Sequence, residues 1–225
     1  MSPESKSSPV TNTGVSAQAV KQLREQTGAG WMDCKAALGA TQGNVEQAVA
    51  WLRKKGMASA QRKAGRATSE GVVASYIHAG NKIGVLVEVN CETDFVARTQ
   101  AFRQLVHDLA MHIAAAEPRF IRRDQITPDI LAREQEIYRE QALASGKPEK
   151  VVDRIVEGKL EKFYEESCLY EQHFIKDDKI TVKELIESVI ASTKENMTVR
   201  RFARFKIGEP LLVSEAPPAE EGGES

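Results

Sequence analysis

The chain has 225 residues, 41% of them hydrophobic, and its 31 Lys and Arg residues nearly balance 32 Asp and Glu residues, for a formal net charge of -1. This length can bury the core of one or two domains, and the balanced charge excludes a protein-wide electrostatic attraction to nucleic acid or to anionic membranes. No stretch is apolar enough to span a membrane and the N-terminus lacks the apolar segment of a secretory signal, so we expect a cytoplasmic protein.

Two terminal segments lack the apolar residues that a core needs. Residues 1–14 are rich in Ser, Pro, Thr and Asn, and residues 209–225 are rich in Glu, Pro and Gly. Such segments bury too little apolar surface to offset the conformational entropy that ordering removes. We therefore expect a disordered tail at 1–14 and an acidic disordered tail at 209–225.

Residues 15–56 contain three short segments with apolar residues three and four positions apart, separated by TGAG and GATQGN. This pattern predicts three helices, and each is so short that we expect them to share one small core. In the second helix the apolar face is expected at Met32, Ala36 and Leu38. Asn44 is expected to cap the third helix and Gly56 to end it.

Residues 57–70 are predicted to form a basic linker that is partly helical. From Lys54 to Arg66 the chain has five basic residues and no acidic one, among Ala, Ser and Gly. Two interpretations are open, contact with nucleic acid or another acidic surface, and a solvated connector. The first interpretation would make the protein a nucleic-acid-binding accessory factor.

Residues 71–208 are predicted to form an α+β domain. Alternating apolar residues on both sides of an AGNK turn indicate a β-hairpin over 71–89, and the alternation in NMTVRRFARFKIGE predicts a strand that joins its sheet. Helical periodicity predicts a helix from about Asp94 to Ala116, another around 182–190, and an antiparallel helical hairpin over 128–168. The predicted fold class is thus α+β, with a three-helix N-terminal domain, an antiparallel sheet packed with helices, and a helical hairpin.

The sequence lacks a constellation of residues typical of an enzyme. His107 and His112 are five positions apart rather than four, which does not suit a zinc site on one helix face. Cys91 and His78 would form a nucleophile and base pair if they lay on adjacent strand ends, although core packing is the simpler explanation of the thiol. The glycine-rich phosphate-binding motifs are missing. We therefore expect no enzyme activity, metal, cofactor or direct nucleotide binding.

The three cysteines, Cys34, Cys91 and Cys168, are scattered and odd in number. This argues against a disulfide framework and against a zinc module built on paired cysteines. We expect reduced thiols, with Cys34 and Cys91 in the core.

The segment NCETDFVAR, Asn90 to Arg98, joins the predicted β-hairpin to the next helix and admits two interpretations. In one, Thr93 or Asp94 caps the helix and Phe95 packs against the incoming strand as a hydrophobic staple. In the other, the corner protrudes, with Phe95 as an aromatic anchor for a partner's pocket and Asp94 as its polar guide. Helix periodicity places Phe95 at the edge of the buried stripe and does not separate the two.

Five segments together resemble the translation elongation factor Ts family, the nucleotide-exchange factors of the GTPase elongation factor Tu. They are LREQTGAGWMDCKAAL (Leu23–Leu38), GNVEQAVAWLRKKG (Gly43–Gly56), NCETDFVAR (Asn90–Arg98), QALASGKPEKVVDRIVEGKLEKF (Gln141–Phe163) and ENMTVRRFARFKIGE (Glu195–Glu209). The resemblance runs from about Val15 to Glu209, with the segments in the family's order. It implies that the chain promotes GDP release from elongation factor Tu by dislodging the Mg²⁺ ion of that GTPase, after which GTP binds.

The resemblance also implies which residues contact the partner. Thr93–Val96 match the T-D-F-V segment of the family, which lies beside the partner's Mg²⁺ site, with Phe95 between partner helices and Asp94 in polar contacts. Lys35 belongs to the N-terminal domain, which resembles a ubiquitin-associated-type domain that docks on the partner's nucleotide domain. His78 matches a His that faces another domain of the partner. Nothing in the sequence favours ubiquitin binding.

Longer members of the family have two related core subdomains, one with the T-D-F-V segment and the other with a Y-x-H…I-G-V-L-V hairpin. Here both motifs lie in one continuous segment, Tyr76–Val96. The chain therefore resembles the short form of the family, in which two chains pair to supply what one long chain holds. We expect a homodimer in the active complex. Cys168 either lies near its interface or is a packed or exposed thiol.

Overall fold

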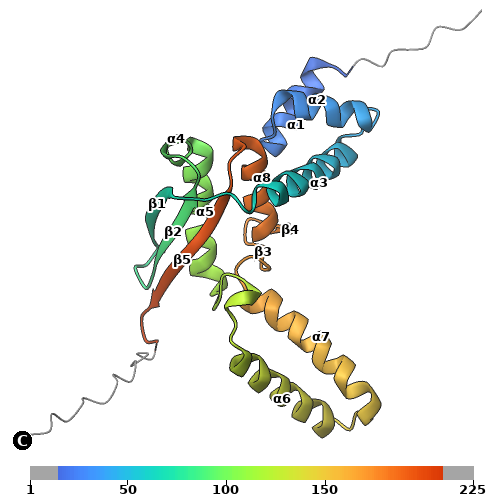
Figure 1. Ribbon diagram of the computed structural model, residues 1–225, viewed down its shortest axis with the longest axis vertical. Helices are drawn as coiled ribbons and strands as arrows, with labels where there is room; N and C mark the ends of the chain where they lie inside the picture. The colour runs from blue at the N-terminus through green and yellow to red at the C-terminus, as the bar shows by residue number, and fades with distance from the viewer. Residues whose placement is uncertain (1–14, 210–225) are drawn as a thin grey trace, which may run out of the picture.

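The computed structural model describes residues 15–209 and has the predicted α+β fold (Figure 1). Three N-terminal helices lie at one end, a three-stranded antiparallel sheet with its helices lies in the middle, and a helical hairpin extends from the other end. The tails predicted at 1–14 and 209–225 fall outside the described residues, apart from Glu209. Within 15–209 there is no helix long and apolar enough to cross a lipid bilayer.

The N-terminal helices are α1 (Ala17–Thr27), α2 (Trp31–Ala40) and α3 (Val45–Lys63). The predicted cap of α3 is confirmed, because the Asn44 side chain accepts a hydrogen bond from the Gln47 N–H over 3.0 Å. All three helices contribute to one small core, formed by Val20, Leu23, Cys34, Ala37, Leu38, Ala48 and Leu52.

The predicted apolar face of α2 is wrong in part. Met32 is 70% exposed and Ala36 is exposed, whereas Cys34, Ala37 and Leu38 are fully buried. Positions 34, 37 and 38 lie on one side of a helix by the three-and-four spacing, and positions 32 and 36 lie on the other. Because α2 is rich in apolar and small residues all round, its pattern alone did not identify the buried side.

The predicted end of α3 at Gly56 is also wrong, since the helix continues to Lys63. A Cβ atom at position 56 would lie 3.5 Å from the Cβ of Ala191 in α8 (Val182–Thr193). The glycine therefore marks a close helix crossing rather than a helix end, and packing against α8 supports the additional turns. Residues 57–63 of the predicted linker are helical.

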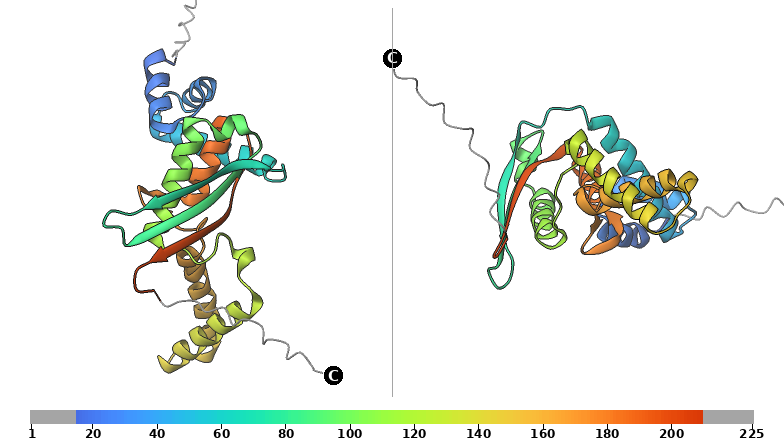
Figure 2. Two further views of the ribbon diagram at one scale, coloured as in Figure 1. Left: turned by 90° about the vertical axis from the view of Figure 1, so that its left-hand side faces the viewer. Right: turned by 90° about the horizontal axis from the view of Figure 1, so that it is seen from below.

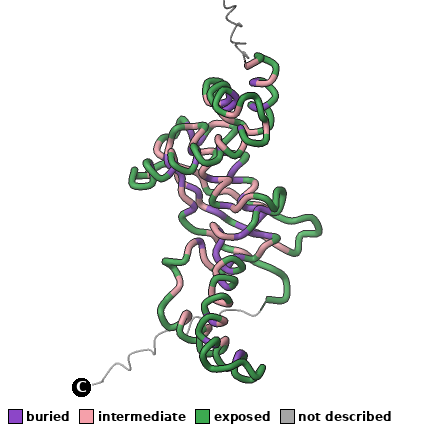
Figure 3. Tube along the Cα trace, turned by 90° about the vertical axis from the view of Figure 1, so that its right-hand side faces the viewer, coloured by how far each residue is buried: buried purple, intermediate pink, exposed green. Residues whose placement is uncertain are grey.

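The central sheet contains β1 (Glu70–Ile77), β2 (Ile83–Cys91) and β5 (Met197–Lys206) in the antiparallel order β1-β2-β5, which confirms the predicted third strand. Helix α5 (Gln100–Ala116) covers one face of the sheet, and α8 packs on α5 from the far side (Figure 2). Buried residues concentrate in these layers (Figure 3). The opposite face of the sheet is not covered by any described element.

The predicted helical hairpin consists of α6 (Pro128–Ala144) and α7 (Glu149–Ser167). It has a small core of its own, formed by Ala142, Val152 and Val156. Arg123, in the short 3-10 helix η1 (Arg123–Gln125), forms ion pairs with Glu161 and Glu171 at the base of the hairpin. Two short strands, β3 (His173–Phe174) and β4 (Asp177–Thr181), were not predicted, because segments this short carry no readable periodicity.

His112, on the buried side of α5, is fully buried, and both of its ring nitrogens have partners. The N–H of Ile175 donates to Nδ1 over 3.3 Å, so the ring proton is on Nε2, which donates to Oε1 of Gln172 over 3.0 Å. Burial lowers the pKa of His112, against a smaller opposing effect of the bond to Gln172. The folded chain therefore holds this imidazole in its neutral form.

This arrangement predicts that stability falls as the pH drops below about 6.5, where the unfolded imidazole takes up a proton and the folded one does not. In urea titrations the free energy of unfolding should decrease from pH 7.5 to 5.5, by at most about 1.4 kcal/mol per pH unit for this group. His112→Gln should show a shallower decrease, and His107→Gln, which alters an exposed ring, should match the parent chain. Equal slopes in His112→Gln and the parent would contradict the assignment.

Candidate functional site

The T-D-F-V segment forms a short helix of its own, α4 (Asp94–Ala97), between β2 and α5. The single helix predicted from Asp94 to Ala116 is therefore wrong. The Thr99 side chain caps α5 by accepting from the Phe102 N–H over 3.3 Å, and it donates to the Val96 carbonyl over 2.8 Å. Threonine competes for backbone groups in this way, and here it ends one helix and begins another.

The break decides how Phe95 is placed. The ring is 76% exposed, so the hydrophobic-staple interpretation is wrong and the corner protrudes from the chain. Next to it, Val96 and Ala97 are only 5% and 7% exposed and belong to the main core. An exposed aromatic ring on a corner that is fixed by buried neighbours has the properties of an interface anchor.

Thr93, and not Asp94, caps α4, because its Oγ1 accepts from the Val96 N–H over 3.4 Å. Asp94 is exposed and forms an i, i+4 ion pair with Arg98 over 2.8 Å. A pair with both side chains this exposed contributes little to stability. The Asp94 carboxylate thus remains accessible to a partner beside the Phe95 ring.

Cys91 lies beneath the corner and is unsuited to nucleophilic catalysis. It is fully buried, its Sγ donates to the Thr93 carbonyl over 3.2 Å, and burial raises the pKa of its thiol. Cys91 pairs with Glu70 at one end of the β-hairpin, whereas His78 follows β1 at the other end. The idea that this cysteine and histidine lie on adjacent strand ends is therefore wrong.

The exposed side of α2 forms a second candidate surface. Lys35 lies there, one turn after Trp31 and Met32, which are 42% and 70% exposed. Met32 was predicted to lie in the core, and no prediction was made for Trp31. The signal for both was the apolar pair Trp31 and Met32 at the start of a short helix, in addition to the apolar residues that fill its buried side.

His78 lies on a third surface, exposed, with its Nδ1 3.1 Å from the hydroxyl of Tyr76. The corner is at the opposite end of β2, which spans nine residues, so the two sites are about 25 Å apart. Lys35 belongs to the N-terminal helices. The structure thus distributes the predicted contact residues over three separate surfaces instead of one cleft.

The basic residues predicted for the linker are largely bound within the chain. Lys55 pairs with Asp33 over 2.8 Å and Arg66 with Glu92 over 3.4 Å. Lys63 is buried and donates to the Ser59 carbonyl over 3.3 Å, and burial lowers its pKa. No observation favours a nucleic-acid surface here.

Cys34 and Cys91 are buried in the core as predicted, and Cys168 is buried as well, with its pKa raised to about 11 by burial. Its place inside the chain does not favour a position at a subunit interface. Among residues 15–209, no three His, Cys, Asp or Glu side chains gather in a way that could hold a metal ion.

Comparison with known proteins shows which family this chain is similar to. The family described as "Elongation factor TS" matches residues 34–209. The protein named Elongation factor Ts of Koribacter versatilis (strain Ellin345) is 60% identical over 90% of this chain and 94% of its own length. Those of Geobacter sulfurreducens and Moorella thermoacetica are 56% and 55% identical over 92% and 89% of this chain, and 96% and 99% of their own lengths. This chain therefore belongs to the elongation factor Ts family.

Proposed function

We propose that this chain is the guanine nucleotide exchange factor of elongation factor Tu, and that the corner Thr93–Val96 opens the magnesium site of that GTPase. The exchange role in general follows from family membership. The observation that supports the finer mechanism is the Phe95 ring, 76% exposed on a corner that its buried neighbours hold in place. We place this activity in the cytoplasm, where translation occurs.

The physics of such a factor is thermodynamic linkage. A protein can drive GDP off a GTPase only by binding the nucleotide-free state more tightly than the loaded state. Each factor of ten in the ratio of the affinities for the two states corresponds to about 1.4 kcal/mol of coupling free energy. The factor therefore needs a contact that only the empty GTPase accommodates, and it does not need to touch the nucleotide.

Phe95 supplies that contact in our proposal. Inserted between partner helices, the aromatic ring acts as a wedge that shifts them away from the Mg²⁺ ion and the phosphates, and Asp94 makes polar contacts beside it. Because the ring is already exposed and α4 is already formed, the corner binds without first unfolding. GTP then enters the empty site and releases the factor.

Lys35 with its neighbours on α2, and His78 at the far end of the sheet, are proposed as additional contacts with the same GTPase. Their separation from the corner suits a partner with several domains. These outlying contacts supply affinity, while the corner supplies the difference between the empty and loaded states.

The experiment that tests the function is the release of fluorescent GDP from purified elongation factor Tu, in the presence of excess unlabelled nucleotide, with and without this chain. Release should accelerate with the concentration of the chain until it saturates. Release at the spontaneous rate at every concentration would refute the exchange role.

We further propose that the active factor is a homodimer formed through the uncovered face of the sheet. Along this face Val73, Ile77, Leu86 and Phe205 are 66%, 60%, 49% and 68% exposed, which is unusual for side chains of this kind on three paired strands. Two such sheet faces pack together well, and in this way each buries its apolar side chains. Leu86 lies at the centre, opposite Ser75 and Ala203 on the two flanking strands.

Leu86→Glu is expected to weaken the dimer at least about a hundredfold, because each subunit would then bury a carboxylate without a partner. The side chain is half exposed in the single chain, so the fold should tolerate the change. Sedimentation velocity should show the parent as a dimer, Leu86→Glu as a monomer, and Leu143→Glu, on the exposed side of α6, as a dimer. A parent chain that is monomeric and fully active in nucleotide exchange would refute the dimer proposal.

A further inference from the structure

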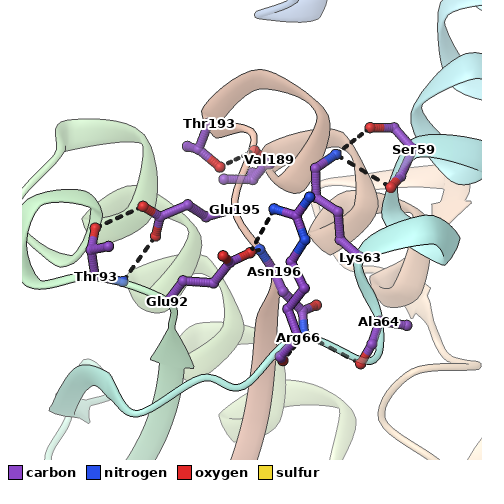
Figure 4. A network of polar contacts seen from close by, with 10 residues as sticks. All are labelled: Ser59, Lys63, Ala64, Arg66, Glu92, Thr93, Val189, Thr193, Glu195 and Asn196. Carbon is purple, nitrogen blue, oxygen red and sulfur yellow. Dashed lines mark hydrogen bonds and ion pairs between the residues drawn. The ribbon is translucent and has the colours of Figure 1, made fainter.

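The corner Thr93–Val96, which carries Phe95, is hydrogen-bonded to the turn between α8 and β5 (Figure 4). The backbone N–H of Thr93 donates to Oε2 of Glu195 over 3.0 Å, and the Thr93 hydroxyl donates to Oε1 of the same carboxylate over 2.7 Å. These two residues are 102 positions apart in the chain. Thr93 is the N-cap of α4, so the Glu195 carboxylate fixes the residue at which the helix with Phe95 begins.

The next residue in this turn binds both the corner and the segment that leaves α3. The N–H of Asn196 donates to Oε1 of Glu92 over 2.6 Å. Its side-chain amide donates to the carbonyls of Ala64 and Arg66 over 3.3 and 2.9 Å. Asn196 is only 3% exposed, so these bonds are shielded from water and geometrically demanding.

The residue before Glu195 shows that this turn is constrained at its start. Lys194 is the C-cap of α8 and has a φ of +68°, a left-handed conformation that non-glycine residues seldom adopt. Its ammonium lies 3.4 Å from Asp33 in α2. Lys194, Glu195 and Asn196 thus contact the N-terminal helices, the corner and the segment after α3 in three successive positions.

From these contacts we propose that Glu195 is a positioning residue for nucleotide exchange. It does not touch the partner; it fixes Thr93, so that α4 presents Phe95 in one orientation before the partner binds. This inference rests on the proposed function of Phe95. A corner released from Glu195 samples other orientations, and the apparent affinity for the empty GTPase falls in proportion to the fraction that remains competent.

Four variants of the full chain test the inference in the GDP-release assay: Glu195→Ala, Glu195→Gln, Phe95→Ala and the double variant Glu195→Ala/Phe95→Ala. Glu195→Ala should lower the exchange efficiency roughly tenfold, for a competent fraction near one tenth. Glu195→Gln keeps one acceptor oxygen for Thr93 and should recover part of the loss. Glu157→Ala, on the exposed side of α7, is the matched control and should act like the parent.

The double variant separates positioning from general damage. If Glu195 acts through the Phe95 ring, removing the carboxylate should cause no further loss once the ring is absent. An additive loss in the double variant would overturn the inference. If Phe95→Ala alone exchanged nucleotide as fast as the parent, the wedge mechanism itself would fail, and the inference with it. A loss in Phe95→Ala without one in Glu195→Ala would leave the wedge standing and refute only the role of Glu195.

Hydrogen exchange measured by mass spectrometry gives a second test that needs no partner. Glu195→Ala should speed amide exchange in the peptide covering residues 92–98, where α4 loses its anchor, and leave the peptides of α6 and α7 unchanged. If the amide protection of residues 92–98 were unchanged, the positioning role would be refuted even if the nucleotide-exchange activity fell.

Discussion

Phe95→Ala should reduce the stimulation of GDP release from elongation factor Tu roughly a hundredfold. Removing an aromatic anchor from the centre of an interface commonly costs about 2 to 4 kcal/mol, and about 1.4 kcal/mol is one factor of ten. The ring is 76% exposed in the chain by itself, so its loss removes almost no packing from the fold. Stopped-flow release of fluorescent GDP at increasing concentrations of the variant measures the effect.

The control for this variant should delete a similar exposed apolar group far from the corner. Leu143, 50% exposed in α6, meets that need, and Leu143→Ala should exchange nucleotide as the parent does. Melting temperatures of both variants should lie within about 2 °C of the parent, because exposed substitutions seldom change stability much. A folded Phe95→Ala chain with full activity would show that the wedge assignment is wrong.

Gly71→Ala should destabilise the fold by about 3 kcal/mol or more, the largest stability effect we expect from adding a single methyl group. Gly71 has a φ of +149°, and a Cβ there would lie 2.3 Å from the Val89 carbonyl oxygen and 2.7 Å from the Asn90 Cα. Both obstacles are backbone atoms of the neighbouring strand and cannot rotate away. The strand must shift, at the end of β2 that leads into the corner.

Thermal unfolding followed by circular dichroism measures this prediction, with a fall in melting temperature of about 6 to 12 °C for a domain of this size. Gly158→Ala is the matched control. Gly158 lies within α7 with open space around the added methyl, and the same change there should stabilise the chain by up to about 1 kcal/mol. If Gly71→Ala melted with the parent, the close approach of β1 and β2 at this position would be wrong.

Several elements could be predicted from the sequence because their signals are local. The alternation in β1, β2 and β5 and the long apolar repeats of the helical hairpin each exceed one period of their secondary structure, so they identify the element without knowledge of its neighbours. The T-D-F-V segment stood out by its place between a predicted strand and a predicted helix, and its expected role came from the resemblance to a family. Its position between a strand and a helix was clear, and the direction of the Phe95 side chain was not.

The errors occurred where contacts between distant parts of the chain determine the local conformation. Gly56 looked like a helix terminator, yet its missing side chain lets α3 approach Ala191 in α8. Met32 fitted an apolar stripe on α2, yet the two neighbouring helices bury the other side. In both cases the local pattern was compatible with two outcomes, and packing against a partner helix selected one of them.

The difference between local signals and contacts of distant residues also applies to the candidate site. The sequence alone identified most of the helices, the three strands of the central sheet and the segment that carries the candidate anchor, because periodicity and capping chemistry act over a few residues. The exposure of Phe95 depends on a helix break at Thr99 together with the burial of Val96. The hydrogen bonds from Thr93 to Glu195 join residues that are 102 positions apart. Contacts over such separations leave no periodic trace in the sequence, since the chain must fold before the two groups meet.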